Sequence, residues 1–253
     1  MTLKTKNLDD CLSDVCPLCG GRGWVFVDYN TVKECECGVL DRERQDSKLR
    51  FASIPETYKD VMLKDMKSSF YDKPDSKEAF KAVGRFVKWY MDHLEKNIDE
   101  GKGIYFWSTT KGSGKTMLAS AMANELIHKH KKYVKFATSL DILDEIKATY
   151  NKESEESESK LLNDLVTADF LIIDDFGTER VSDWAGEKFY QIVNKRYINK
   201  KVTFFTSNYD LKTLKYDERI TNRMRERAFL VHFPEESVRE FKARQDEKGV
   251  KLS

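Results

Sequence analysis

The sequence predicts an α/β fold with a parallel sheet, and three observations lead to that prediction. From about residue 101 onward, apolar runs typical of buried strands alternate with helical segments, an order that favours a parallel sheet. A glycine-rich stretch, Gly112-Ser-Gly-Lys-Thr116, lies between a strand and a helix. A second apolar run, Phe170 to Ile173, ends in the carboxylates Asp174 and Asp175. Unbroken apolar runs of this kind are typical of strands that are covered on both faces.

The glycine-rich stretch reads as a phosphate-binding loop. It follows the strand Ile104 to Trp107 and precedes a helix over Met117 to His130, which is the context of the G-x-x-x-x-G-K-[ST] motif. Backbone N–H groups of such a loop and the helix N-terminus attract phosphate oxygens. We therefore expect Gly112, Ser113 and Gly114 to cradle phosphates, Lys115 to reach the β- and γ-phosphates of ATP, and Thr116 to ligate Mg²⁺.

Thr109 departs from this motif, because it occupies the position of the first glycine. Glycine there permits a left-handed backbone or a close approach, which a β-branched residue tolerates poorly. A nucleotide site of weakened affinity is therefore one reading. A chance Gly/Ser/Lys turn is disfavoured by the flanking strand and helix. Thr109 is still counted among the nucleotide-binding residues.

The run that ends at Asp174 reads as a Walker B strand. Its carboxyl end emerges at the binding edge of a parallel sheet, beside the glycine-rich loop. Asp174 is expected to hold Mg²⁺ directly or through water, and Asp175 to polarise the attacking water. A buried strand that simply ends in an acidic turn is the alternative, and the upstream Gly-Lys-Thr makes it the weaker one.

The remaining elements follow from periodicity and turn residues. Thr138 and Asp141 are placed like a helix capping pair. The acidic run over residues 151–160 is expected to be a solvated loop. Strands are expected over residues 24–27, 31–32, 133–137, 202–206 and 229–233, and helices over 41–48, 78–94, 139–150 and 183–197.

Composition limits the functional classes. The chain has 253 residues, of which 34% are charged, with a net charge of only +1, so any contact with DNA must come from a local patch. No run of apolar residues is long enough to span a membrane. Residues 1–10 contain no apolar segment typical of a secretory signal. A cytoplasmic location is expected.

All five cysteines lie in the first 37 residues. Cys16 and Cys19 form a C-x-x-C pair, and Cys35 and Cys37 form a tighter C-x-C pair beyond a short hairpin. Four thiolates presented by two turns suit a tetrahedral Zn²⁺ ion. Cys11 is expected to be a bystander that could replace one ligand, and free thiols in a disordered arm are the alternative. So short a segment would draw its folding energy from the metal.

The chain is therefore divided into three parts. Residues 1–45 are expected to form the zinc module, residues 46–100 a linker and N-terminal helices, and residues 101–253 the nucleotide-binding domain. Two polar segments belong to the last part. Asn208, at the end of a strand, could orient a hydrolytic water, although a simple Ser-Asn turn is the alternative. The arginine-rich helix over residues 217–227 could reach the γ-phosphate of a neighbouring subunit, and a solvated basic face is the alternative.

Taken together, these motifs resemble one family. The chain resembles the bacterial and phage helicase loaders of the DnaC/DnaI type, within the AAA+ ATPases. The resemblance rests on a zinc pattern before Ile54-Pro-Glu56 together with Gly114–Thr116, Leu171–Glu179, Trp184, Thr206–Asn208 and Arg219–Met224.

The resemblance implies a five-stranded parallel sheet in the order 5-1-4-3-2 without a C-terminal helical lid. It also implies sensor 1 at Asn208, an arginine finger at Arg223 and, less directly, sensor 2 at Arg239. Two residues depart from the family pattern: Thr109 replaces glycine, and Asp175 stands where many AAA+ proteins carry glutamate. A shorter carboxylate places the water less closely, so we expect slow, switch-like hydrolysis.

The expected function is that of an ATP-dependent helicase loader with ATP, Mg²⁺ and Zn²⁺ as cofactors. The zinc module would grip a hexameric replicative helicase, and the AAA+ domains would associate side by side and hold single-stranded DNA. Hydrolysis, stimulated by DNA or the partner, would release the assembly. A transposition helper ATPase of the IstB type and a non-hydrolysing DNA-binding adaptor are the alternatives.

Overall fold

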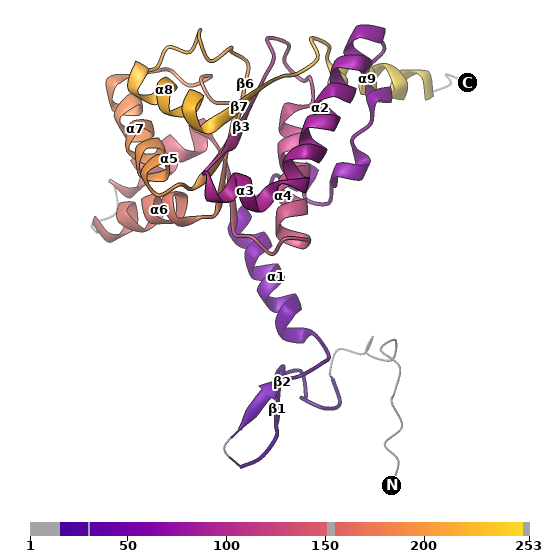
Figure 1. The fold of residues 1–253 in the computed structure, drawn as a ribbon, viewed down its shortest axis with the longest axis vertical. Helices are drawn as coiled ribbons and strands as arrows, with labels where there is room; N and C mark the ends of the chain where they lie inside the picture. The colour runs from indigo at the N-terminus through magenta and orange to yellow at the C-terminus, as the bar shows by residue number, and fades with distance from the viewer. Residues whose placement is uncertain (1–15, 30, 151–154, 250–253) are drawn as a thin grey trace. The chain divides into compact units, whose positions relative to one another are not determined.

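The fold is described from a computed structural model, which describes residues 16–29, 31–150 and 155–249 (Figure 1). The chain divides into two compact units, residues 1–51 and residues 52–253. None of the helices in the described part of the chain has the length and apolar composition that crossing a bilayer requires.

The first unit contains a hairpin and a helix. Strands β1 (Trp24–Phe26) and β2 (Val32–Glu34) pair antiparallel, with Phe26 opposite Val32. Helix α1 (Val39–Ala52) follows. The predicted hairpin and charged helix are thus confirmed, although each has slightly different bounds. Within residues 16–51 as described, Cys19 and Cys35 are the buried side chains, so this unit has no apolar core of its own.

The second unit is built on a parallel sheet of five strands. Their order in space is β4-β5-β6-β3-β7, and every neighbouring pair is parallel. Numbered along the chain and read from β7, this is the order 5-1-4-3-2 that the family resemblance implies. The strands are β3 (Gly103–Trp107), β4 (Val134–Thr138), β5 (Phe170–Asp174), β6 (Val202–Ser207) and β7 (Ala228–His232).

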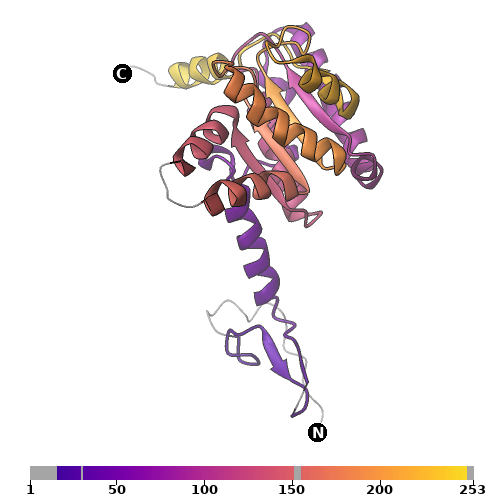
Figure 2. The same ribbon diagram turned by 90° about the vertical axis from the view of Figure 1, so that its left-hand side faces the viewer.

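Helices cover both faces of this sheet (Figures 1 and 2). Leu171 and Ile173 of β5 join a buried cluster with residues of α5 to α8. The alternate residues Phe170 and Ile172 are buried as well, and α4 contacts this strand. This alternation explains why the strand is apolar throughout. The helices are α2 (Pro74–Asp92), α3 (Leu94–Asp99), α4 (Lys115–His128), α5 (Ser139–Thr149), α6 (Glu155–Thr167), α7 (Asp183–Ile198), α8 (Glu218–Arg227) and α9 (Val238–Gly249).

One sequence expectation is wrong. Residues 155–160 begin helix α6 and are not a loop, while residues 151–154 lie outside the described part of the chain. The apolar face that holds this helix starts only at Leu161, and it continues at Leu162 and Leu165 against the buried cluster. The segment that ends at Lys160 therefore contains none of the apolar residues that hold the helix. The Thr138 cap of α5 is confirmed, since its Oγ1 accepts the Asp141 N–H at 3.0 Å.

Three single-turn 3₁₀ helices precede α2. They are η2 (Glu56–Tyr58), η3 (Leu63–Asp65) and η4 (Ser68–Phe70). Asn124 of α4 holds the first of them, because its Nδ2 donates to Tyr58 O and Val61 O at 2.9 and 2.8 Å. Just after η4, the buried Tyr71 hydroxyl donates to Ser113 O at 2.7 Å. This segment is thereby fixed against the glycine-rich loop.

Candidate nucleotide site and metal centre

The glycine-rich loop connects β3 to α4 and turns at two glycines. Gly112 and Gly114 have φ of 74° and 100°, in the left-handed region that glycine adopts without strain. Thr109 is not among the described residues with positive φ. The left-handed backbone that a β-branched residue would resist is therefore not required at this position.

Lys115 is buried at the start of α4. Its Nζ donates to Ser108 O, Thr110 O and Ser113 Oγ at 3.2–3.3 Å and to Asn208 Oδ1 at 3.1 Å. These four acceptors are neutral oxygens, so the loop holds the cation without neutralising it. Burial lowers the pKa of Lys115 to about 8, although the carboxylates of Asp175, Glu235 and Asp174 partly oppose the shift. An anion such as a phosphate would relieve this cost.

The paired carboxylates lie where β5 ends. Asp174 is buried, and its Oδ1 accepts the Thr206 hydroxyl at 2.5 Å. The same Thr206 oxygen accepts the Asp175 N–H at 3.0 Å. Asp175 has φ of 52°, a conformation that aspartate adopts more readily than most residues and that recurs at functional sites. One hydroxyl on the neighbouring strand thus fixes both acidic residues.

Burial raises the pKa of Asp174 to about 6. Hydrogen bonds from Thr206 and Thr116 lower it in part, whereas the nearby Asp175 raises it. A buried carboxylate beside a threonine hydroxyl offers two hard oxygen ligands, which suit Mg²⁺. The donor set of Thr116 and Asp174 therefore fits the metal that the sequence predicts there.

These elements surround one cavity of about 300 Å³. Residues of the glycine-rich loop line it together with Thr57, Tyr58, Met117 and Val238. The complete lining is Thr57, Tyr58, Lys111, Gly112, Ser113, Gly114, Lys115, Thr116, Met117, Asp175, Asn208, Val238 and Arg239.

Most of the predicted site residues line this cavity, but Thr109, Asp174 and Arg223 do not. Asp174 is buried directly beside Asp175, which does. Thr109 is not in the lining, and its N–H and hydroxyl instead bond Glu235. Arg223 lies on α8, away from the cavity of its own chain. Its Nε donates to Asn194 Oδ1 at 2.8 Å, and its guanidinium carbon lies 5.2 Å from the Tyr190 ring and 5.5 Å from the Tyr197 ring.

The neighbouring arginines differ from one another. Arg225 is exposed, as a solvated face would require. Arg227 instead donates to Glu100 O at 2.6 Å and lies 4.9 Å over the Tyr197 ring. The reading of Arg227 as part of a solvated basic face is therefore wrong.

Sequence reasoning missed several residues that build the site. Thr57 and Tyr58 line the cavity although they precede the sheet by many residues. In the sequence, Thr206 stands out only as part of a Thr-Ser-Asn segment, and Glu235 does not stand out at all. A β-strand that ends in hydroxyl residues beside Walker B was a usable signal for Thr206, whereas no local pattern marks Glu235.

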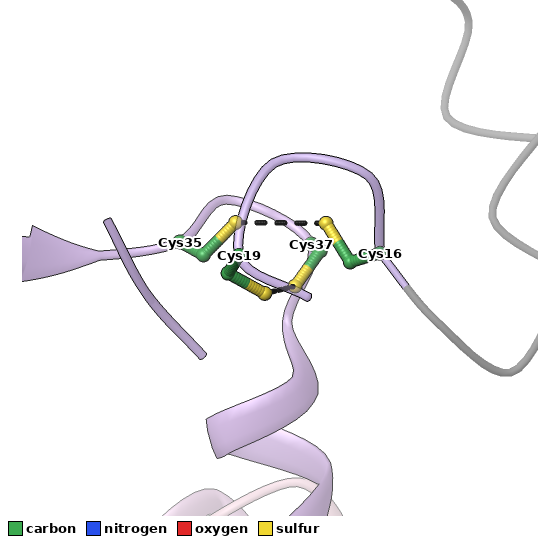
Figure 3. Close-up of side chains that lie close together, drawn as sticks. All are labelled: Cys16, Cys19, Cys35 and Cys37. Carbon is green, nitrogen blue, oxygen red and sulfur yellow. Dashed lines mark hydrogen bonds between the residues drawn. The ribbon is translucent and has the colours of Figure 1, made fainter. Parts of the chain in front are cut away.

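In the first unit, four cysteine side chains converge (Figure 3). The Sγ atoms of Cys16, Cys19, Cys35 and Cys37 all lie within 4.8 Å of one another. Cys16 and Cys35 approach to 3.8 Å, and Cys19 and Cys37 to 3.7 Å. A tetrahedral zinc ion with Zn–S bonds of about 2.3 Å requires sulfur separations of about 3.8 Å. The geometry and the thiolate donors therefore fit Zn²⁺, and Cys11 lies outside the described residues.

The sheet order, the glycine-rich loop and the Walker B carboxylates together define a P-loop NTPase of the AAA+ type. The model of the family described as IstB-like ATP binding protein matches residues 96–243, and the chain belongs to this family.

Relatives agree with that assignment. The replicative helicase loader DnaC of Buchnera aphidicola subsp. Baizongia pistaciae (strain Bp) is 35% identical over 162 residues, which are 63% of this chain. The match spans 64% of that relative's length.

Solved structures are similar as well. The crystal structure of the DnaC helicase loader matches 71% of this chain and 99% of its own, with a TM-score of 0.59 at 24% identity. That of DnaI matches 71% and 94%, with a TM-score of 0.54 at 26% identity. These similarities confirm the resemblance to DnaC/DnaI-type proteins.

Proposed function

We propose that the cavity binds ATP with Mg²⁺. Lys115 would contact the β- and γ-phosphates, the N–H groups of Gly112 to Gly114 would bind phosphate oxygens, and Thr116 and Asp174 would hold the metal. The observation that carries the proposal is the buried Lys115 ammonium, whose hydrogen-bond acceptors among the described residues are all neutral, in a cavity that Asp175 also lines. Thr57 and Tyr58 would contact the nucleoside.

Hydrolysis would follow from the residues around the γ-phosphate. Asp175 would polarise the attacking water, and Asn208 would orient it while it also bonds Lys115. The backbone of Asp175 is fixed by Thr206, so its short carboxylate has little freedom to approach the water. We infer a slow ATPase that DNA or a partner stimulates.

Arg223 would complete the site of a neighbouring copy. It faces away from its own cavity and is held between two tyrosine rings, which keeps the guanidinium ordered on the surface of α8. An arginine in trans stabilises charge that develops on the γ-phosphate. The AAA+ domains would therefore associate side by side, and Arg239 would act from within the same chain, since it lines the cavity.

We propose the role of a helicase loader for the whole chain. The zinc module would grip a hexameric replicative helicase, and the AAA+ assembly would hold single-stranded DNA while the helicase is placed. A reducing cytoplasm would keep the four cysteines as thiolates for the metal. The similarity to proteins named replicative helicase loader DnaC supports this role.

A transposition helper of the IstB type is the second candidate, because the matching family model carries that name. The model covers residues 96–243 and leaves the zinc module outside. A transposition helper would need only the AAA+ part, whereas a loader would also use the zinc module to bind the helicase. A non-hydrolysing DNA-binding adaptor is the third candidate, and ATP turnover separates it from the other two.

The test is to measure ATP turnover with no DNA, with oligo(dT) and with a purified hexameric replicative helicase. A loader should turn over ATP and should place the helicase on circular single-stranded DNA, as scored by displacement of an annealed oligonucleotide. Lys115→Ala should fail in both assays. Turnover that responds only to duplex DNA and a transposase would favour the IstB-type role, and no turnover under any condition would favour the adaptor.

A further inference from the structure

The segment between β7 and α9 runs along the glycine-rich loop. We call Pro234–Arg239 the strap. At one end, Ser108 Oγ donates to Pro234 O at 3.2 Å. Near the other end, the Val238 N–H donates to Gly112 O at 2.9 Å. The strap is therefore joined to the loop on both sides of the position where the motif lacks its first glycine.

One carboxylate fills the space between these two attachments. Glu235 Oε1 accepts the Thr109 N–H at 3.0 Å, and its Oε2 accepts the Thr109 hydroxyl at 2.8 Å. Oε2 also accepts the N–H and the hydroxyl of Thr110 at 2.8 and 2.7 Å. His232 Nε2 lies 2.8 Å from Oε1. Four donors from two consecutive loop residues thus converge on a single side chain.

This carboxylate stays ionised at neutral pH. Burial raises the pKa of Glu235, but the hydrogen bonds from Thr110, His232 and Thr109 outweigh it and hold the pKa at about 2. Hydrogen bonds to a charged acceptor are stronger than those between neutral groups. The Thr109 N–H thereby obtains an acceptor from outside the loop. The Thr110 N–H is shared between Glu235 Oε2 at 2.8 Å and Ser108 Oγ of the loop at 3.2 Å.

The same contacts explain how the loop closes without the first glycine. Thr109 keeps an ordinary backbone conformation, and both of its polar groups point to Glu235 and away from the cavity. Glu235 does not line the cavity itself, so it would act on a nucleotide through the loop, besides the effect of its charge on Lys115. Arg239, four residues along the strap, does line the cavity.

We propose that Glu235 is a positioning residue for nucleotide binding, which sets the conformation of the loop at Thr109 and Thr110 in place of the missing glycine. Because the strap also carries Arg239, the carboxylate fixes the loop and this arginine relative to each other. The inference rests on the proposed nucleotide site, and it concerns a residue to which the motif itself gives no role.

The first test compares the affinity of the full-length chain for Mg²⁺ and the fluorescent nucleotide mant-ATP in Glu235→Ala, Glu235→Gln and the parent. We expect Glu235→Ala to weaken binding about tenfold, the equivalent of about 1.4 kcal/mol. Glu235→Gln should lie between the two, because its amide keeps one acceptor oxygen. Glu240→Ala is the matched control, since it removes the same charge from an exposed position of α9 and should bind as the parent does. Thermal unfolding of each variant shows whether it is folded.

The second test is a rescue that a merely structural role would not produce. Thr109→Gly supplies the glycine of the ordinary motif, so the loop should depend less on the carboxylate. The double variant Thr109→Gly/Glu235→Ala should therefore recover most of the affinity that Glu235→Ala loses. Additive losses, with no recovery, would overturn the inference.

Other results distinguish a failure of the role inferred for Glu235 from a failure of the proposed nucleotide site. If the parent binds mant-ATP and Lys115→Ala binds it far more weakly, the nucleotide site stands. Unchanged or tighter binding by a folded Glu235→Ala would then overturn the positioning role, since it would mean that the carboxylate is neutral or merely repels the phosphates. A parent that does not bind mant-ATP would overturn both.

Discussion

Each of the two units of this protein is stabilised in its own way. In residues 52–253, strands and helices bury a continuous apolar core, and the candidate site is placed on the rim of that core. In residues 16–51 as described, none of the large apolar side chains is fully buried, and Trp24 and Phe26 keep 44% and 75% of full exposure. The second unit can therefore fold through burial, whereas the first would need a metal ion held by its four clustered cysteines.

This difference matters for how each part can fail. Single substitutions at a site supported by a buried sheet should abolish function and leave the unit folded, because most of the stability of the unit comes from residues outside the site. A metal module without a core should lose fold and function together when the metal leaves. The following predictions test that contrast.

The largest effect should come from removing the metal. Structural zinc contributes about 10–16 kcal/mol in small zinc modules, so chelation should unfold the region around Cys16 to Cys37. Mant-ATP binding by the core should survive the same treatment. Amide NMR spectra before and after chelation follow both units at once.

Elemental analysis assigns the ligands. Zinc content should fall from near one per chain to near zero in Cys16→Ser, because three thiolates leave the tetrahedral site open. Cys11→Ser is the control and should keep its zinc. The reverse pattern would reassign the ligands. Helicase binding that survives chelation would move the partner surface to the AAA+ unit.

The next largest effect should come from removing Arg223, the arginine proposed to act in trans. Arg223→Ala should leave nucleotide binding by a single chain intact and should lower turnover about 10³-fold, as for other arginine fingers. Mixing Arg223→Ala with Lys115→Ala protein should restore part of the turnover, since a shared site needs one sound half from each chain. If no mixing ratio restores any activity, the arginine belongs to a solvated face.

Asp175→Asn should separate binding from chemistry. Asp174 would still hold Mg²⁺, so ATP affinity should stay near that of the parent, while turnover should fall by at least about 10²-fold. Single-turnover hydrolysis of radiolabelled ATP measures the chemical step. Hydrolysis at the parent rate would place the base elsewhere.

Lys115→Ala should weaken nucleotide binding without unfolding the core. Loss of a buried, hydrogen-bonded charge against the phosphates should cost about 3 kcal/mol, which is about a hundredfold in the dissociation constant. Mant-ATP titration measures the loss, and circular dichroism checks the fold. Equal affinity in parent and variant would contradict the phosphate-binding assignment.

The smallest effect should be a dependence on pH. The pKa of Asp174 is raised from 3.8 to about 6. At pH values between these two, the Asp174 carboxyl is therefore protonated in the folded, metal-free protein and ionised in the unfolded chain. The stability of the folded protein should therefore decline as pH rises from about 4 to about 6. Mg²⁺ needs the ionised carboxylate, so the affinity for Mg²⁺ and ATP should rise over the same interval.

At pH 5 this affinity should be about tenfold weaker than at pH 7, because a proton competes with the metal for one group. Titrations with mant-ATP at fixed Mg²⁺ across this range measure the slope. Asp174→Asn is the control, and its weaker binding should not depend on pH in this interval. An equal slope in the variant would assign the titration to another group.

The sequence by itself determined the elements whose signals are local. Apolar runs located all five strands of the sheet, and the Thr138 cap located the start of α5. The Gly-Lys-Thr stretch, the Walker B carboxylates and the spacing of four cysteines predicted which residues the structure brings together. These patterns depend on neighbours within a few residues, so they can be read without the fold.

Only the tertiary structure decided which distant groups complete the site. Glu235 meets Thr109 across 126 positions of the chain, and Thr206 meets Asp174 across 32. Helix α6 forms because its late apolar residues find a cluster to pack against. Arg223 lies outside the lining of the cavity, on α8, where it contacts Asn194 of α7. Such contacts follow from the order of the strands in space, and that order places residues side by side that no local pattern connects.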